Sequence, residues 1–199
     1  MAIHKLTTPL SEEIIRKLHI KDIVYLSGTI FTARDKAHER ALKWLEQGKE
    51  LPIDLSGAVV FHCGPLVKKV EENWELVAAG PTTSARMEPF EDKFINAFKV
   101  RMIIGKGGMG PKTVNAMKEV GSVYSIFTGG AAVLAAKAVK NIKRVEWLDL
   151  GMAEALWMMD VEKFGPLIIA IDSTGKNLFE EVMNKVEINR KKLYKMLGF

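Results

Sequence analysis

Cationic and hydroxyl side chains gather in three short segments of this sequence. TARDKAH contains Arg34, GPTTSARM contains Thr82, Thr83 and Arg86, and IGKGGMGPKT contains Lys106. Arginine binds a carboxylate through two parallel hydrogen bonds, whereas lysine offers a mobile point charge. The three cations and the hydroxyl pair therefore predict a clamp for a small dicarboxylate, without a reaction centre of its own.

The segment GPTTSARM leaves two interpretations open. Thr83 or Ser84 could cap the helical turn that follows Pro81, because a hydroxyl oxygen there accepts a backbone N–H. An anion favours the same position, since unpaired N–H groups and the helix dipole point toward it. Arg86 lies in the first turn, where a helix favours an acid, so either a bound carboxylate or a salt bridge with Glu88 accounts for it.

The segment IGKGGMGPKT is similar to a phosphate-binding loop, but Pro111 stands where that motif requires lysine. What remains is a strand, a glycine-rich turn with Lys106 and a helix opened by proline, which could form a backbone cradle for an anion. A tight turn that needs glycine at positive φ, with Lys106 in solvent, accounts for the same residues.

TARDKAHER carries a cation at the start of a predicted helix. Arg34 opens this helix, His38 follows at helical spacing, and Asp35 could pair with Arg34 or cap the turn. The functional and the structural interpretations of these residues are both open.

Apolar runs alternate with amphipathic runs along the chain, which predicts an α/β fold. The cationic segments adjoin strand-like runs, and ligands of open α/β sheets bind beyond the carboxyl ends of strands. The small residues of 127–139 and the methionines Met152, Met158 and Met159 predict packing rather than a site. The predicted strands cover residues 22–32, 58–62, 76–79, 100–104, 122–127 and 167–171, and the predicted helices cover residues 33–47, 90–98, 111–120, 131–139 and 178–197.

The composition is that of one globular domain over residues 1–199, with 48% hydrophobic and 27% charged residues. No apolar run approaches the roughly 18 to 20 residues that cross a bilayer, and the N-terminus lacks a signal-peptide pattern, so we expect a cytoplasmic protein. The single cysteine, Cys63, cannot form an internal disulfide or a metal site built on several thiolates. A net charge of +5 favours anionic partners, but lysines crowd the C-terminal segment as on a solvated helix face, so the charge does not indicate nucleic acid.

Taken together and in this order, TARDKAH, GPTTSARM, GKGGMG, FTGGAA and WLDLGMAEALW resemble the C-terminal domain of class I fumarases. They equally resemble its free-standing counterpart, the β subunit of two-subunit fumarases and L(+)-tartrate dehydratases. The resemblance covers nearly the whole chain and implies an iron-sulfur hydro-lyase with a single swivelling β/β/α-type domain. It also implies a partner α subunit whose three cysteines hold a 4Fe-4S cluster, in a heterotetramer of two α and two β subunits, with no metal bound by this chain.

The same resemblance implies roles for five residues. The carboxylate-binding arginines of the family match Arg34 and Arg86, and its substrate-binding lysine matches Lys106. The base that takes the carbon-bound proton matches Thr82, and Thr83 lies beside it as a substrate-binding residue.

The implied reaction is the reversible hydration of a C4 dicarboxylate. Fumarate to (S)-malate is the favoured case, and dehydration of L(+)-tartrate to oxaloacetate is the alternative, because both substrates carry two carboxylates at similar separation. A rival of another class is a non-catalytic phosphate or nucleotide binder that uses IGKGGMGPKT. The segment HCGP departs from many relatives, which leaves a role for His62 open, and we expect its Cys63 to be a buried structural thiol.

Overall fold

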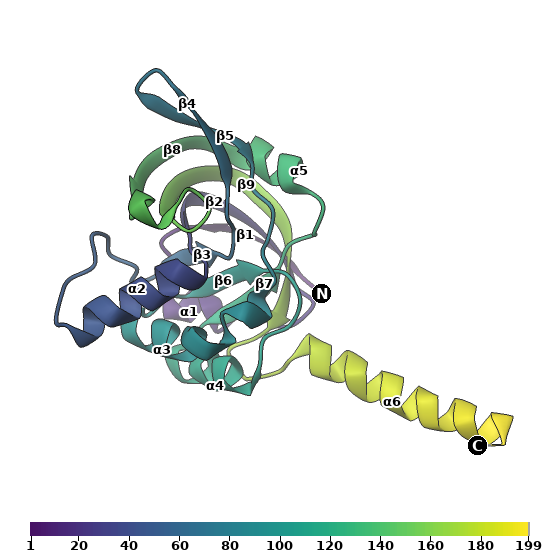
Figure 1. The fold of residues 1–199 in the computed structure, drawn as a ribbon. Coiled ribbons are helices and arrows are strands. Elements are labelled where there is room, and N and C mark those ends of the chain that lie inside the picture. The colour runs from purple at the N-terminus through teal and green to yellow at the C-terminus, as the bar shows by residue number, and fades with distance from the viewer. Residues whose placement is uncertain (199) are drawn as a thin grey trace.

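A β-sheet that closes on itself forms the centre of the protein (Figure 1). The structure, a computed structural model, describes residues 1–198. The strands of the sheet within these residues are β1 (Ile3–Thr7), β2 (Ile23–Thr32), β3 (Val59–Phe61), β6 (Met102–Gly105), β7 (Val123–Ile126), β8 (Val139–Glu146) and β9 (Leu156–Ile171). Their order is β1-β2-β3-β6-β7-β9-β8, and an additional pairing of β2 with β9 closes a small barrel.

Strand β9 is the element that closes this barrel. Its 16 residues pair antiparallel with β2, β7 and β8. The pairs among β1, β2, β3, β6 and β7 are all parallel, and parallel neighbours require crossover connections. The carboxyl ends of β2, β3 and β6 therefore emerge at the same edge of the sheet.

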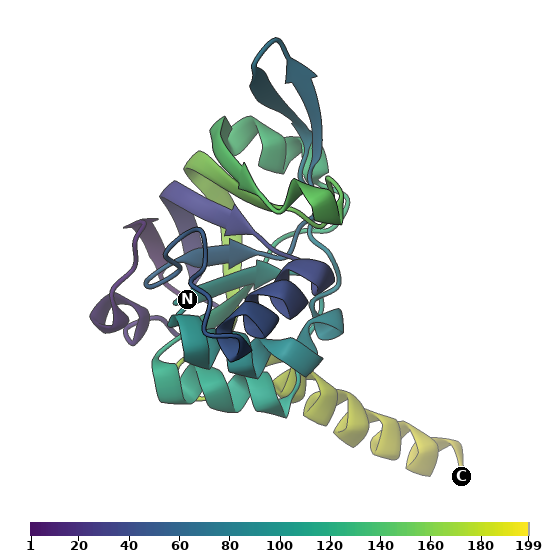
Figure 2. The same ribbon diagram turned by 60° about the vertical axis from the view of Figure 1, so that its left-hand side comes forward.

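Helices α2 (Asp35–Glu46), α3 (Glu88–Phe98) and α4 (Pro111–Val120) lie together on one face of the sheet (Figures 1 and 2). Local sequence sets the limits of α4. The helix begins with Pro111, whose missing N–H would have no partner within the helix at that position, and it is capped by Gly121, which adopts φ +74. Within residues 1–198 the helices are α1 (Glu12–Ile15), α2 (Asp35–Glu46), α3 (Glu88–Phe98), α4 (Pro111–Val120), α5 (Ala132–Ala138) and α6 (Leu178–Leu197), with short 3₁₀ helices η1 (Ser84–Arg86) and η2 (Leu148–Leu150).

Apolar side chains are buried on both faces of the sheet. On β6, Ile103 packs among the helices and Ile104 packs inside the barrel, because successive side chains of a strand point to opposite faces. Trp157 and Phe164 of β9 lie in the barrel cluster, and Phe94 of α3 lies in the helix-side cluster. Burial on both faces explains why the parallel strands are continuous apolar runs.

Two elements extend from this body. Strands β4 (Leu66–Val70) and β5 (Asn73–Ala78) form a separate antiparallel hairpin at the top of Figure 1. Helix α6 projects away from the sheet in both views, and none of its described side chains is buried (Figures 1 and 2). Among residues 1–198, no helix combines the length and the apolar character that a membrane span requires.

The α/β prediction is confirmed, and the predicted helices and strands are present with shifted bounds. Strands β1, β4 and β8 and the first part of β9 were not predicted. Two ion pairs explain why β8 and the first part of β9 were not predicted from the sequence. Lys140 contacts Glu162 at 2.9 Å, and Lys143 contacts Asp160 at 2.8 Å. These cross-strand charges interrupt the apolar pattern from which a strand is predicted.

Candidate active site

The segments that carry the predicted site residues meet at one edge of the sheet. Strands β2, β3 and β6 are parallel neighbours, so the segments that follow them emerge together. The segment between β5 and η1 lies across the segments that follow β3 and β6. Pro81 forms a β-bridge with Cys63, and Thr83 forms a β-bridge with Lys106. Residues 34, 82–86 and 106, far apart in the sequence, thus share one surface.

The two predicted carboxylate-binding arginines lie beside one carboxylate. Arg34 is the N-cap residue of α2, and its Nη2 lies 3.2 Å from Glu154 Oε1 and 4.0 Å from Asp35 Oδ2. Arg86, at the end of η1, donates from Nη2 to the same Asp35 oxygen at 2.8 Å. The structure therefore brings both guanidinium groups close to the Asp35 carboxylate, which Arg86 contacts directly, whereas Arg34 pairs more closely with Glu154.

Arg34 is the more enclosed of these two side chains, with 19% exposure against 53% for Arg86. A Cβ atom on Gly64 would lie 2.6 Å from Arg34 Nη1, so glycine at this position leaves the space that the guanidinium occupies. The Nε–H of Arg34 is buried and has no hydrogen-bond partner among residues 1–198. An unpaired buried donor costs free energy and is consistent with a site that a ligand completes.

Backbone hydrogen bonds anchor the hydroxyl pair and the lysine. The Thr82 N–H donates to the His62 carbonyl at 2.6 Å, and the Ser84 N–H donates to the Lys106 carbonyl at 2.9 Å. Thr82 is half-buried, while Thr83 and Lys106 are exposed. Thr83 is the N-cap residue of η1 but makes no side-chain capping hydrogen bond, so the capping interpretation is wrong for Thr83.

The anion cradle considered at the start of α4 is filled by a carboxylate of the chain itself. The Gly110 N–H and the Thr113 hydroxyl each donate to Glu88 Oε2 at 2.7 Å. This turn is therefore not an open phosphate site. Glu88 is also not the partner of Arg86, which pairs with Asp35 instead.

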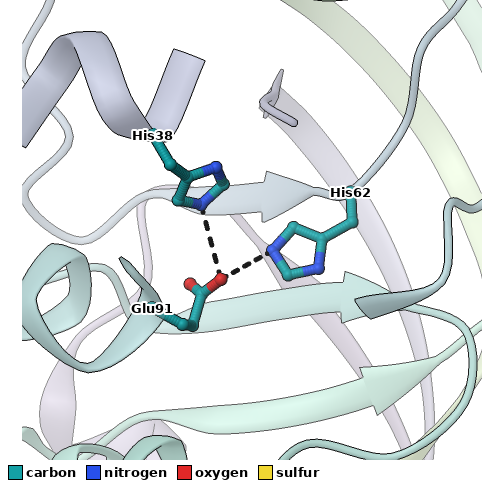
Figure 3. Close-up of side chains that lie close together, drawn as sticks. All are labelled: His38, His62 and Glu91. Carbon is teal, nitrogen blue, oxygen red and sulfur yellow. Dashed lines mark ion pairs between the residues drawn. The ribbon is translucent and has the colours of Figure 1, made fainter. Parts of the chain in front are cut away.

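A fully buried polar cluster lies beneath these segments (Figure 3). It consists of His38 from α2, His62 from the segment after β3 and Glu91 from α3, each 0% exposed. Glu91 Oε2 lies 2.9 Å from His62 Nε2 and 3.4 Å from His38 Nε2. One carboxylate oxygen therefore faces both imidazole rings, as the dashed lines in Figure 3 mark.

The charges of this cluster stabilise one another. Burial opposes the ionisation of Glu91, but the charges of His62 and His38 outweigh burial and lower its pKa to about 2. Burial also opposes the protonation of His38, but the charge of Glu91 outweighs that effect and raises the pKa of His38 above its ordinary value. At neutral pH the cluster holds a carboxylate next to an imidazolium.

Two imidazoles and a carboxylate could also bind zinc, and their ligand atoms lie within 4.8 Å of one another. Ligand atoms at about 2.0 to 2.1 Å from a tetrahedral zinc ion are about 3.3 Å apart. His62 Nε2 and Glu91 Oε2 are only 2.9 Å apart, which is the distance of a direct donor–acceptor contact. The geometry is that of a buried ion pair, and we assign no metal ion to it.

Ser84 connects this cluster to the surface segments. Its Oγ lies 3.0 Å from His62 Nδ1 and accepts a hydrogen bond from the Lys106 N–H at 3.2 Å. The buried Tyr124 hydroxyl lies 3.0 Å from the same Oγ and donates to the Gly107 carbonyl at 2.8 Å. Burial raises the pKa of Tyr124, so its hydroxyl keeps the proton that it donates.

Cys63 is a buried thiol. It is 0% exposed, and burial raises its pKa to about 12, although the charge of Arg34 partly opposes that rise. The expected burial of this side chain is confirmed.

Sequence reasoning missed the pairing of Asp35 with Arg86 and the contributions of the Ser84 hydroxyl and of Glu91 to this site. One signal was present for Glu91, which precedes Phe94 and Ile95 by about one turn on the buried face of α3. An acidic side chain is almost never fully buried unless it is paired. The identity of its partners could not be read from spacing, because His38 and His62 come from other elements.

Comparisons with known proteins place the chain in a family. Residues 2–182 match a family model described as Fumarase C-terminus. The L(+)-tartrate dehydratase subunit beta of Escherichia coli (strain K12) is 46% identical over 176 residues, which are 88% of this chain and 86% of that protein. A Methanocaldococcus jannaschii protein provisionally given the same name is 44% identical over 190 residues, which are 95% of this chain and 96% of that protein.

A longer relative carries a fumarase name. A Geobacillus stearothermophilus protein provisionally named fumarate hydratase class I is 40% identical over 178 residues, which are 89% of this chain and 34% of that protein. The recognition of the family from its motifs is confirmed. Because the family match spans most of the residues and these relatives are at least 40% identical over most of the chain, the chain belongs to the Fumarase C-terminus family.

Proposed function

We propose that this chain is the β subunit of a hydro-lyase that reversibly hydrates fumarate to (S)-malate, with residues 1–199 forming its substrate-binding domain. The observation that carries this proposal is that Arg34 and Arg86 lie together beside Asp35, where Arg86 pairs with Asp35 and Arg34 pairs with Glu154. Lys106 is joined to the same surface through its bridge with Thr83. A surface on which two neighbouring guanidinium groups already pair with carboxylates is suited to carboxylate ligands.

In this function the cations bind the two ends of the substrate. Arg34 and Arg86 bind carboxylate groups through paired N–H donors, and Lys106 adds a positive charge. Thr83 donates a further hydrogen bond from an exposed position. A substrate carboxylate competes with Asp35 for Arg86, so Asp35 holds the guanidinium in the orientation in which it receives the ligand.

Thr82 carries the proton transfer in this proposal. In the dehydration direction, the C–H bond next to the hydroxyl-bearing carbon breaks, and Thr82 Oγ takes that proton while its own hydroxyl proton passes to an acceptor. The electron pair of the C–H bond forms the double bond, and the hydroxyl group leaves the neighbouring carbon as hydroxide, which takes up a proton and is released as water. A threonine hydroxyl is a weak base, so it needs an ionised acceptor, which we assign to the partner chain.

The partner in this proposal is an α subunit that holds a 4Fe-4S cluster, in a heterotetramer of two α and two β subunits. When bound, the cluster supplies a Lewis acid for the substrate hydroxyl group. The cysteine content supports this division, because the single Cys63 cannot supply the several thiolates that hold such a cluster. We further propose a cytoplasmic location and a swivelling movement of this domain against the α subunit.

A second candidate function is the dehydration of L(+)-tartrate to oxaloacetate. The names of relatives that are 46% and 44% identical favour it. Arg34, Arg86 and Lys106 would serve either substrate, since both carry two carboxylates. The ratio of kcat/KM for malate to kcat/KM for tartrate, measured on the assembled complex, distinguishes the two.

The experiment that tests the proposal compares the isolated chain with the assembled complex. We expect the chain alone to fold, to stay colourless on anaerobic iron–sulfide reconstitution and to hydrate no fumarate. Activity is expected on mixing with the α subunit. Turnover by the purified chain contradicts the two-subunit proposal. A salt-sensitive affinity for polyphosphate or RNA, with no effect of fumarate on the Tm of the complex, supports the rival phosphate binder.

A further inference from the structure

One buried polar network contacts four segments at the edge of the sheet, which are TARDKAH, HCGP, GPTTSARM and IGKGG. The cluster of His38, His62 and Glu91 contacts TARDKAH through the Arg34 carbonyl, which lies 2.8 Å from His38 Nδ1. His62 belongs to HCGP, and its Nδ1 contacts Ser84 of GPTTSARM. Ser84 Oγ in turn accepts from the backbone of IGKGG. The segments that hold the proposed substrate-binding residues are thus connected below the surface.

The positions of the protons in this network follow from its acceptors. A carbonyl oxygen only accepts, so His38 Nδ1 carries a proton that it donates to the Arg34 carbonyl. The other ring nitrogen, Nε2, faces the ionised Glu91 at 3.4 Å. A lone pair facing a carboxylate is repelled, so Nε2 is protonated as well. His38 is therefore a buried imidazolium.

The second half of the network leads from Glu91 to the surface segments. His62 Nε2 faces Glu91 Oε2 at 2.9 Å, and His62 Nδ1 lies 3.0 Å from Ser84 Oγ. Ser84 Oγ accepts a hydrogen bond from the Lys106 N–H. The Glu91 carboxylate is therefore the group at which the two halves of the network meet.

We propose that Glu91 is the positioning residue of the substrate site: its carboxylate holds His38 as an imidazolium, contacts His62 as well, and thereby links the Lys106 backbone to the Arg34 backbone through buried polar contacts. Glu91 touches no substrate. Its effect on binding passes through the two segments that carry Lys106 and Arg34, and this part of the inference rests on the proposed function.

Other groups near His38 leave this assignment intact. Asp35 of the same helix adds a smaller favourable charge to the imidazolium. The Phe94 ring of α3 lies 4.4 Å from the His38 ring between centroids and carries no charge. Tyr124 of β7 is kept protonated by burial and adds none either. Glu91 is thus the main source of the negative charge that holds the proton on His38.

The protonation of His38 can be tested on the full chain without any activity measurement. The chain has four histidines, and the His38 signals in ¹⁵N-labelled protein are identified by their loss in His38→Gln. We expect both ring nitrogens of His38 to be protonated at pH 7 and to stay so at pH values where an exposed histidine is neutral. A neutral His38 ring at pH 7 in the unaltered chain overturns the proposal.

Glu91→Gln tests the origin of this charge. The substitution keeps the shape and removes the negative charge, so we expect His38 to become neutral at pH 7, with Glu91→Asp restoring its charge. The matched control is Glu162→Gln, which removes a half-exposed carboxylate paired with Lys140. An imidazolium that persists in Glu91→Gln overturns the proposal. If Glu91→Gln does not fold, the ¹⁵N spectra of the unaltered chain and of Glu91→Asp still decide whether His38 is an imidazolium at pH 7.

The positioning role is measured in the assembled complex. We expect Glu91→Gln to raise KM for the dicarboxylate on the order of tenfold, with a smaller change in kcat, since a displaced cation loses a charge-assisted contact. Glu91→Asp should recover part of the loss, and Glu162→Gln should leave KM unchanged. An unchanged KM in Glu91→Gln overturns the positioning role. If the unaltered complex lacks hydro-lyase activity, the proposed function fails, whereas the ¹⁵N result still decides the charge of His38.

Discussion

The two neighbouring guanidinium groups of Arg34 and Arg86 should each be hard to replace in the proposed site. We expect Arg86→Lys in the assembled complex to lower kcat/KM about tenfold to a hundredfold, because lysine cannot form two parallel hydrogen bonds to a carboxylate. The loss of a charge-assisted contact costs about 1.5 to 3 kcal/mol, which corresponds to that range. Steady-state kinetics with malate measure the effect, and Arg34→Lys should behave alike.

The control for these substitutions is Arg16→Lys, which alters a half-exposed arginine paired with Glu12 in α1, outside the site. Exposed ion pairs contribute little, so its kinetics should be normal. Normal kinetics in both Arg34→Lys and Arg86→Lys would mean that these two arginines are structural.

Substitution of Thr82 should affect catalysis far more than stability. We expect Thr82→Ala to lower kcat about a hundredfold to ten-thousandfold, the contribution of a positioned general base. Its Tm should change little, because its described anchor is the backbone N–H, which alanine keeps. Exchange of the carbon-bound hydrogen of malate with deuterated solvent should fall in parallel with kcat.

Two comparisons sharpen this test. Thr29→Ala removes a hydroxyl that donates to Asp160 on the barrel, away from the site, and should leave exchange unchanged. Thr83→Ala removes the neighbouring hydroxyl. If Thr83→Ala abolishes exchange while Thr82→Ala does not, the base is Thr83, and if neither does, the base lies on the partner chain.

The end of β6 and the turn η1 approach each other so closely that only glycine fits between them. A Cβ atom on Gly105 would lie 1.8 Å from Ser84 Oγ and 3.0 Å from Tyr124 Oη. We expect Gly105→Ala to displace Ser84 and to destabilise the protein by about 1 to 3 kcal/mol, the usual cost of an added methyl group in a packed interior. Chemical denaturation measures this loss of unfolding free energy.

Substrate binding should respond to the same substitution. Because Ser84 joins the Thr82 segment to Lys106, KM of the assembled complex should rise in Gly105→Ala. Gly48→Ala is the comparison, since a Cβ there meets no atom within 4 Å and only the positive φ opposes it. Equal KM values in the two variants would mean that the approach of β6 to η1 does not position the site.

The stability of the folded protein should depend on pH through the buried ion pair. The folded-state pKa of Glu91 is lowered to about 2 from 4.5, so its contribution is present above pH 4.5 and is lost as the pH falls toward 2. The pKa of His38 is raised above 6.5, so its contribution is complete below pH 6.5 and is lost as the pH rises through the folded-state value. The pair therefore stabilises the protein most between pH 4.5 and 6.5.

Denaturation at several pH values tests this window. The unfolding free energy of the unaltered chain should exceed that of Glu91→Gln by about 3 to 5 kcal/mol inside the window, as expected for removal of one partner from a buried pair. The difference should shrink on both sides. Glu162→Gln, with an exposed ion pair, should show a small difference throughout. A difference for Glu91→Gln that does not vary with pH contradicts the ion-pair assignment.

Local sequence was sufficient for the α/β class and for most elements. Proline and glycine mark the limits of α4, and apolar runs mark the buried parallel strands, because these signals act over a few residues. The motifs around Arg34, Arg86 and Lys106 were enough to recognise the family. The roles of these residues and of Thr82 remain predictions.

Long-range contacts determined the rest. Glu88 fills the turn before α4 from 22 residues away, and this excludes the open anion cradle that spacing alone allowed. The antiparallel closure by β9 depends on pairing with strands from both halves of the chain. The meeting of His38, His62 and Glu91 joins three elements. Sequence periodicity reports only which face of an element is buried, whereas the partner of a buried charge is set by how the elements pack together.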